Sequence, residues 1–221
     1  MKIEAIFFDL DNTLYPTTEF AERARRNAIN AMRESGLNVS EQKAYNTLLN
    51  VIKKHSSNYD YHFDEMLKEI GADYSPRIIA AGIVAYHNTK ASILPFPEAK
   101  TTILKLRDIG YRLYIASEGN TLKQWDKVIR LGLHLMFHNM FVTQEFGRNK
   151  SKEFYASILK KLKLRPQQCI MVGDSQGKDI RPAKQAGMHT VIISKTRQRG
   201  PADYAIRNTG ELLRVLEKLE G

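Results

Sequence analysis

Residues 3–13 read Ile-Glu-Ala-Ile-Phe-Phe-Asp-Leu-Asp-Asn-Thr, an apolar run that gives way abruptly to polar residues. A short continuous apolar run is typical of a strand buried on both faces, so we expect a strand over Ile3–Asp9. Asp9 and Asp11 then lie where the chain leaves this strand for a turn. One such carboxylate can act as nucleophile in phosphoryl transfer while the other exchanges protons. Aspartate is also common in turns, so the motif alone leaves both interpretations open.

Downstream of Pro97 the chain alternates between helical and strand-like patterns. The expected strands are Arg112–Ala116, Met140–Val142, Gln168–Val172, Thr190–Ile193 and a short extended piece at Asp203–Ile206. The expected helices are Glu98–Ile109, Leu122–Leu131, Lys152–Lys161, Asp179–Ala186 and Thr209–Leu219. Alternation of this kind predicts an α/β fold, with a Rossmann-like parallel sheet flanked by helices.

Between the first strand and this alternating region lie four helical patterns. The last of them opens at Ser75-Pro76, because serine caps helices and proline fits the first turn. The block Pro16–Ile93 is therefore expected to be an all-helical insertion after the first strand. The predicted domains are an α/β core of residues 1–15 and 94–221 and a helical domain of residues 16–93.

Polar residues suited to chemistry follow several expected strands: Ser117, Lys150 and Asp174. Because the carboxyl ends of parallel strands meet at one edge of an open sheet, we expect them to converge with Asp9. Ser117 alone is also explained as a helix cap, and Lys150 as a surface charge. For Asp174 a Mg²⁺ ligand is favoured, since an unpaired carboxylate at a strand end is costly. Asp179 fits either a metal site or a helix-start charge.

Four segments in this order resemble the motifs of the haloacid dehalogenase-like hydrolase superfamily. These motifs are Asp-x-Asp-x-Thr after an apolar strand, a strand ending in Ser or Thr, a lysine ahead of a helix bearing an aromatic, and Gly-Asp-x-x-x-x-Asp. The matching positions are Asp9, Asp11 and Thr13; Ser117; Lys150 with Tyr155; and Gly173, Asp174 and Asp179. The resemblance spans the chain from residue 1 to about residue 195.

The resemblance implies a role for each position. Asp9 would be the nucleophile and a Mg²⁺ ligand, and Asp11 the general acid and base, with its backbone carbonyl on the metal. Lys150 would complete the catalytic set by holding phosphoryl oxygens. The other implied candidates are Ser117, Asn120, Thr13 and Lys152 for phosphate binding, Asp174 for metal binding, and Asp179 and Ser175 for support behind the ligands.

Two departures from the family pattern bear on these assignments. Many relatives have proline after the motif lysine, whereas Lys150 precedes Ser151, so Lys152 competes for the same role. After Ser117 the chain has Glu-Gly-Asn where Asn-Gly is usual, which puts the phosphate contacts of this segment in question. Counting from Tyr155 and Asp174 favours Lys150 as the motif lysine. The final choice between the two lysines and the phosphate contacts after Ser117 stay open.

Within the family, Asp11 favours phosphoryl chemistry, because halide displacement needs no acid for its leaving group. The expected function is Mg²⁺-dependent hydrolysis of a small phosphorylated metabolite through an aspartyl phosphate on Asp9. The helical insertion resembles a cap that closes over the site and selects the substrate. Two alternatives stay open: a phosphoglucomutase-like mutase, and a non-catalytic basic protein that binds nucleic acid.

Charge, cysteine count and hydropathy indicate which partners and which cellular location to expect. The formal charge of +10 arises from 34 Lys and Arg against 24 Asp and Glu, spread along helices without interleaved aromatics, so a nucleic-acid partner is not expected. The single cysteine, Cys169, excludes an intramolecular disulfide. With no apolar run of membrane-spanning length and no signal-peptide pattern at the start, we expect a cytoplasmic protein without a membrane partner, as a monomer or homodimer.

Overall fold

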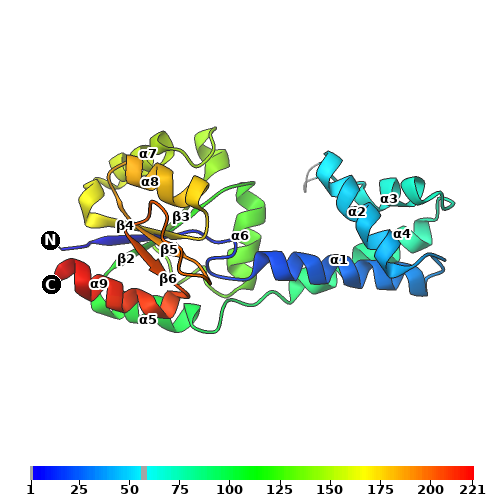
Figure 1. The fold of residues 1–221 in the computed structure, drawn as a ribbon, viewed down its shortest axis with the longest axis horizontal. Coiled ribbons are helices and arrows are strands. Elements are labelled where there is room, and N and C mark those ends of the chain that lie inside the picture. The colour runs from blue at the N-terminus through cyan, green and yellow to red at the C-terminus, as the bar shows by residue number, and fades with distance from the viewer. Residues whose placement is uncertain (1, 56–58) are drawn as a thin grey trace. The chain divides into compact units, whose positions relative to one another are not determined.

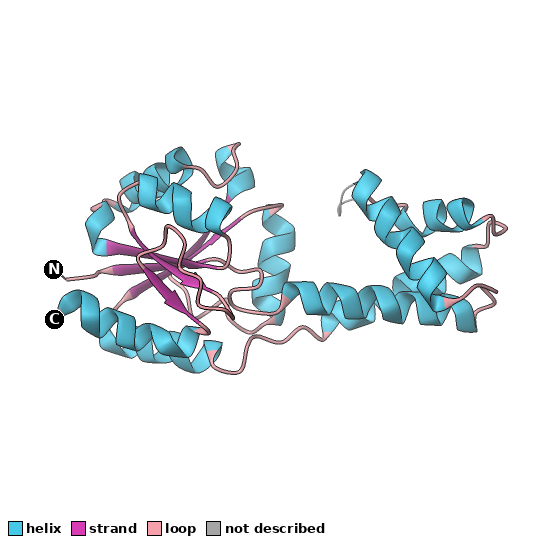
Figure 2. Cartoon of the chain, in the orientation of Figure 1, coloured by secondary structure: helices cyan, strands magenta, loops and turns pink. Residues whose placement is uncertain are grey.

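The computed structural model describes residues 2–55 and 59–221, so Met1 and residues 56–58 of the predicted domains lie outside the described part. The described residues contain a six-stranded sheet (Figure 2). The strands are β1 (Ala5–Phe8), β2 (Arg112–Ser117), β3 (Asn139–Val142), β4 (Cys169–Gly173), β5 (His189–Ile193) and β6 (Tyr204–Ile206). They lie in the order β3-β2-β1-β4-β5-β6, and every neighbouring pair is parallel. The predicted α/β fold is confirmed.

Helices cover both faces of this sheet. They are α5 (Ala99–Ile109), α6 (Thr121–Arg130), α7 (Lys152–Leu162), α8 (Arg181–Gln185) and α9 (Leu212–Glu220). Figure 1 shows α7 and α8 on one face and α5 and α9 on the other. Among the described residues, no helix is both long and apolar enough to cross a membrane.

Aromatic packing fixes the central strands against one another. Phe7 on β1 is aligned with Tyr114 on β2 and with Met171 on β4. The rings of Phe7 and Tyr114 stack with their centroids 5.1 Å apart. Phe154 and Tyr155 of α7 belong to the same buried cluster. Burial of such large side chains is the main favourable term that holds the strand register.

The segment after β4 differs from the helix expected over Asp179–Ala186. A π-helical turn, Gln176–Ile180, comes first, and α8 follows from Arg181. Pro182 gives a physical reason, because it has no N–H to donate to the carbonyl of Lys178 four residues earlier. That carbonyl instead accepts a hydrogen bond from the Tyr155 hydroxyl at 3.3 Å. The expectation was therefore wrong at the start of this helix.

The chain forms two compact units, one of residues up to Thr17 together with Leu94–Gly221, the other Thr18–Ile93. The helices of the second unit are α1 (Thr17–Glu34), α2 (Glu41–His55), α3 (His62–Ile70) and α4 (Pro76–Ala91). Their inward faces form a separate apolar core. Ser75 caps α4 by accepting from the Ile78 N–H, and Gly71 ends α3 with a φ of 77° that favours glycine.

Candidate active site

The carboxyl ends of β1, β2 and β4 meet at a cavity of about 440 Å³. The register aligns Phe8 with Ile115 and Val172, so the three strands end at the same edge. The backbone N–H of Asp9 donates to the Val172 carbonyl at 2.9 Å, which fixes the start of the acidic loop. The cavity is lined by Asp9, Asp11, Asn12, Glu118, Lys150, Asp174, Ser175, Lys178 and Asp179.

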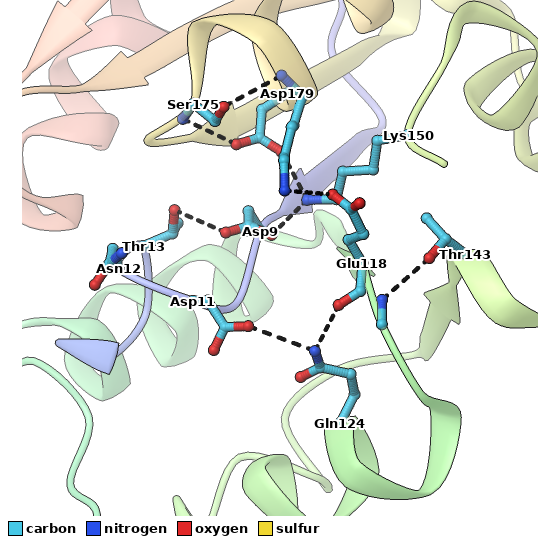
Figure 3. Close-up of polar contacts among 12 residues, drawn as sticks. Asp9, Asp11, Asn12, Thr13, Glu118, Gln124, Thr143, Lys150, Ser175 and Asp179 are labelled. Carbon is cyan, nitrogen blue, oxygen red and sulfur yellow. Dashed lines mark hydrogen bonds and ion pairs between the residues drawn. The ribbon is translucent and has the colours of Figure 1, made fainter. Parts of the chain in front are cut away.

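Asp9, Lys150 and Asp179 form a buried charged triad at the base of this cavity (Figure 3). Lys150 Nζ lies in a close ion pair with Asp9 Oδ1 and donates to Asp179 Oδ1 at 2.7 Å. The three residues are 6%, 7% and 1% exposed in sequence order. Lys150 therefore bridges two carboxylates that would otherwise be buried side by side without a cation.

Burial and charge act in opposite directions on these groups. Burial raises the pKa of Asp9 to about 7; the Lys150 ammonium opposes this rise, and the neighbouring Asp179 adds to it. Burial disfavours the charged form of Lys150, but Asp9 and Asp179 outweigh it and raise the lysine pKa above its ordinary value. Asp9 is therefore a partly desolvated carboxylate beside a permanent cation, an arrangement suited to a nucleophile.

An acidic cluster at the same edge could hold a divalent cation. One carboxylate oxygen from each of Asp9, Asp174 and Asp179 lies within 4.8 Å of the others. The two oxygens of Asp179 already accept from Lys150 Nζ and, at 3.0 Å, from the Ser175 N–H. Burial, then the charge of Asp179, raises the pKa of Asp174. Asp9 and Asp174 are thus the carboxylates best placed for a hard cation that prefers oxygen ligands.

Asp11 points away from this cluster and is held by residues that sequence reasoning missed. Its carboxylate accepts from Lys127 Nζ at 2.7 and 2.9 Å and from the hydroxyls of Tyr15 and Thr17, each at 2.8 Å. Gln124 Nε2 adds a longer contact at 3.4 Å. Burial opposes ionisation of Asp11, but these interactions, led by the Lys127 charge, lower its pKa. The free protein therefore favours the carboxylate form of Asp11.

Two hydroxyl candidates for phosphate binding lie deep in the fold. Thr13 is 1% exposed and its hydroxyl donates to Asp9 Oδ2 at 3.4 Å. Ser117 is fully buried at the end of β2, and its Oγ has no hydrogen-bond partner within residues 2–55 and 59–221. A buried hydroxyl without a partner is costly, which is consistent with a ligand that completes its hydrogen bonding.

The remaining candidates have other contacts. Asn120 Oδ1 accepts from the Lys123 N–H and caps α6, and Asn120 does not line the cavity. Lys152 is exposed at the start of α7, so Lys150 is the one of the two lysines that contacts Asp9. Ser175 caps the π-helical turn by accepting from the Lys178 N–H at 3.2 Å.

Glu118 and Lys178 form a second contact that the sequence did not predict. Lys178 Nζ lies 2.9 Å from Glu118 Oε2, and both residues line the cavity. The usual Asn-Gly after the motif serine is replaced here by Glu118 and Gly119, and the Gly119 N–H donates to Thr143 Oγ1 at 3.1 Å. Since Glu118 and Lys178 are 60 positions apart in the sequence, their spacing carries no signal of this pair.

Comparison with models of protein families agrees with the fold. The family model described as haloacid dehalogenase-like hydrolase matches residues 3–187, and the chain belongs to this family. Its relatives include several named phosphatases, and the chain is a phosphoric monoester hydrolase. The identification from the four sequence motifs is confirmed.

Individual relatives align over nearly the whole chain. It is 40% identical over 225 residues to the glyceraldehyde 3-phosphate phosphatase of Methanocaldococcus jannaschii, covering 99% of each protein. It is 41% identical over 229 residues to the enzyme of the same name from Methanopyrus kandleri, covering 98% of each. A crystal structure of a HAD phosphatase from Thermococcus onnurineus matches with a TM-score of 0.70 at 25% identity, over 97% of this chain and 98% of that one.

Proposed function

We propose that this chain is a Mg²⁺-dependent phosphatase that hydrolyses a small phosphomonoester through an aspartyl phosphate on Asp9. The observation that carries the proposal is the buried Asp9–Lys150–Asp179 triad at the end of β1, beside Asp174. It supplies a nucleophilic carboxylate, a fixed cation and acidic metal ligands within one cavity. A helix cap or a surface ion pair would not require this degree of burial.

In the first step Asp9 attacks the phosphorus atom and the bond to the substrate oxygen breaks. Lys150 and the hydroxyls of Ser117 and Thr13 would hold the phosphoryl oxygens as negative charge redistributes. Asp11 would give a proton to the departing oxygen. The bound phosphate favours this proton, because a nearby negative charge raises the pKa of a carboxyl group.

In the second step a water molecule attacks the phosphorus of the aspartyl phosphate. Asp11 takes the proton from this water, and Asp9 departs as a carboxylate with release of inorganic phosphate. Lys127, Tyr15 and Thr17 favour the carboxylate form of Asp11, which is the form needed for this proton abstraction. The contacts of Asp11 therefore suit the hydrolytic step directly.

The proposed metal site consists of Asp9, Asp174 and the backbone carbonyl of Asp11. Mg²⁺ bound there would neutralise phosphate charge as the phosphoryl group is transferred. Asp179 would keep Lys150 in place from behind these ligands, since it contacts the lysine at 2.7 Å. The oxygen-only donor set fits Mg²⁺ better than a softer metal.

We further propose glyceraldehyde 3-phosphate as the substrate, on the basis of the names of the relatives that are about 40% identical over the full length. The unit Thr18–Ile93 would act as the cap that selects it. Purified protein is expected to hydrolyse glyceraldehyde 3-phosphate with a kcat/KM on the order of 10⁴ M⁻¹ s⁻¹ or higher. Activity should stop with EDTA and return with Mg²⁺, as measured by phosphate release across a panel of phosphometabolites.

The outcomes of this panel test the proposed substrate separately from the proposed phosphatase activity. Preference for another phosphomonoester would contradict the substrate but leave the phosphatase intact. Undiminished hydrolysis in EDTA would contradict the metal requirement. Interconversion of phosphate positions without phosphate release would point to a mutase instead.

Replacement of Asp11 by Asn is expected to affect poor leaving groups most. An alkoxide needs a proton as it departs, whereas a nitrophenolate does not. Loss of the general acid therefore slows the reaction of alkyl phosphates more than that of p-nitrophenyl phosphate. We expect formation of the phosphoenzyme to slow about 10³-fold with glycerol phosphate, but only about tenfold with p-nitrophenyl phosphate. Rapid-quench kinetics with both substrates measures this difference. Equal losses would argue against a proton-donor role for Asp11.

A further inference from the structure

The ion pair between Glu118 and Lys178 lies at the cavity that contains Asp9. Glu118 directly follows Ser117, and Lys178 directly precedes Asp179. The pair therefore joins the first residue after β2 to the π-helical turn after β4. The buried serine ends that strand, and the aspartate that binds Lys150 lies in that turn. Figure 3 shows Glu118 extending toward the region around Lys150 and Asp179.

Lys178 is an exposed cation in a cavity whose lining is mostly acidic. The lining includes five carboxylates and two lysines, so negative groups formally exceed positive ones by three. Of the two lysines, Lys150 is 7% exposed and is bonded to two buried carboxylates. Lys178 has a side chain that is 63% exposed and pairs with a single glutamate. It is the more exposed of the two lysines that line the cavity.

The backbone of Lys178 is fixed although its side chain is exposed. Its N–H donates to Ser175 Oγ at 3.2 Å, and its carbonyl accepts from the Tyr155 hydroxyl at 3.3 Å. Lys178 Nζ is close to Glu118 Oε2, but that oxygen is buried and accepts no hydrogen bond from the described residues, so charge attraction alone holds the pair. Because the lysine side chain is mostly exposed, solvent screens this attraction and a second anion can compete for the ammonium group. A phosphate dianion offers the ammonium group a stronger partner than one carboxylate does.

We propose that Lys178 is a second phosphate-binding lysine. Its ammonium group pairs with Glu118 in the free enzyme and contacts the phosphoryl group instead when substrate is bound. This inference rests on the proposed phosphatase function. Glu118 then acts through Lys178, as the competing anion that substrate phosphate must displace. The two residues should therefore have opposite effects on substrate affinity when each is replaced.

The test measures KM, kcat and competitive inhibition by inorganic phosphate in four variants. Lys178→Met is expected to raise both KM and the phosphate inhibition constant about five- to tenfold, with kcat within about twofold. Lys178→Arg should stay within about twofold of wild type for all three. Glu118→Gln should lower KM and the inhibition constant about two- to threefold, and the double variant should match Lys178→Met alone.

Lys184→Met is the matched control. Lys184 pairs with Asp203 in the same compact unit as the cavity, with side-chain exposures of 46% and 29% against 63% and 30% for Lys178 and Glu118. Neither Lys184 nor Asp203 lines the cavity. The substitution removes the same charge as Lys178→Met, and its phosphate inhibition constant should equal that of wild type.

Several results would overturn the proposal while leaving phosphatase activity in wild type intact. One is an unchanged phosphate inhibition constant in Lys178→Met, which would mean that Lys178 does not contact the phosphoryl group. Another is a weaker affinity for inorganic phosphate in Glu118→Gln, which would make Glu118 itself a ligand-binding residue. An equal shift in Lys184→Met would mean that the loss of one positive charge anywhere on the protein explains the effect. Absence of phosphatase activity in wild type would instead contradict the function on which the proposal rests.

Discussion

Replacement of Asp9 by Asn is expected to lower kcat by about 10⁴-fold or more, for every phosphomonoester that the enzyme accepts. The amide nitrogen and oxygen of asparagine do not attack phosphorus, so the covalent step is lost while the shape of the side chain is kept. Asp9 is also the residue that Lys150, Thr13 and the acidic cluster converge on. The loss should therefore be in chemistry as well as in metal binding.

The folded state should tolerate this change. Asp9 is a buried carboxylate whose pKa is raised to about 7, and a neutral side chain there removes a desolvated charge. Lys150 keeps Asp179 as its partner. We expect a melting temperature within a few degrees of wild type, measured by circular dichroism. Asp126→Asn, which removes an exposed carboxylate from α6, is the matched control and should retain full activity.

Replacement of Lys150 by Met is expected to damage both activity and stability. It removes the cation between Asp9 and Asp179 and leaves two buried carboxylates close together. Breaking a buried pair from one side typically costs about 3–5 kcal/mol, and loss of a phosphoryl-binding cation lowers kcat by about 10³-fold. Urea unfolding and steady-state kinetics measure the two effects.

The stability loss should depend on pH. The pKa of Asp9 is about 7 with Lys150 present, and removal of the ammonium raises it further. A carboxyl group with a higher pKa in the folded state favours folding at low pH and loses that contribution as pH rises through the folded pKa. The deficit of Lys150→Met relative to wild type is therefore expected to be larger at pH 8 than at pH 5.

Lys152→Met provides the control for this lysine. It removes the same charge two residues later, from an exposed position at the start of α7. Activity and stability should both stay near wild type. The reverse pattern, with Lys152→Met inactive and Lys150→Met active, would assign the motif role to the other lysine.

Most of the fold could be predicted because its signals are local. The buried run before Asp9 and the alternation after Pro97 both depend on neighbouring residues, and both predicted the parallel sheet. The start of the helix after β4 could not be predicted in the same way. There, Pro182 has no N–H to donate to the Lys178 carbonyl. The hydroxyl of Tyr155, 23 positions before Lys178, donates to that carbonyl instead, and no local pattern predicts this contact.

The site residues that directly follow a strand could be predicted from the sequence. Asp9 and Asp174 follow strands that the sequence marks clearly, and their convergence follows from parallel topology. Which lysine is buried depends on the path of the chain into α7, so the sequence left that choice open. Lys127, 116 positions from Asp11, pairs with it only through tertiary packing, and no sequence period links them.

The most direct test of the central claim is chemical trapping of the phosphoenzyme during turnover. Borohydride reduces an acyl phosphate to an alcohol, so an aspartyl phosphate on Asp9 becomes homoserine, which mass spectrometry locates in the peptide containing residues 3–13. We predict homoserine at position 9 when enzyme turns over p-nitrophenyl phosphate, which has no carbonyl group for borohydride to reduce, with Mg²⁺. We predict no homoserine without substrate or in Asp9→Asn. Reduction at another residue, or unmodified Asp9 throughout a single turnover in which phosphate is released, would contradict the account.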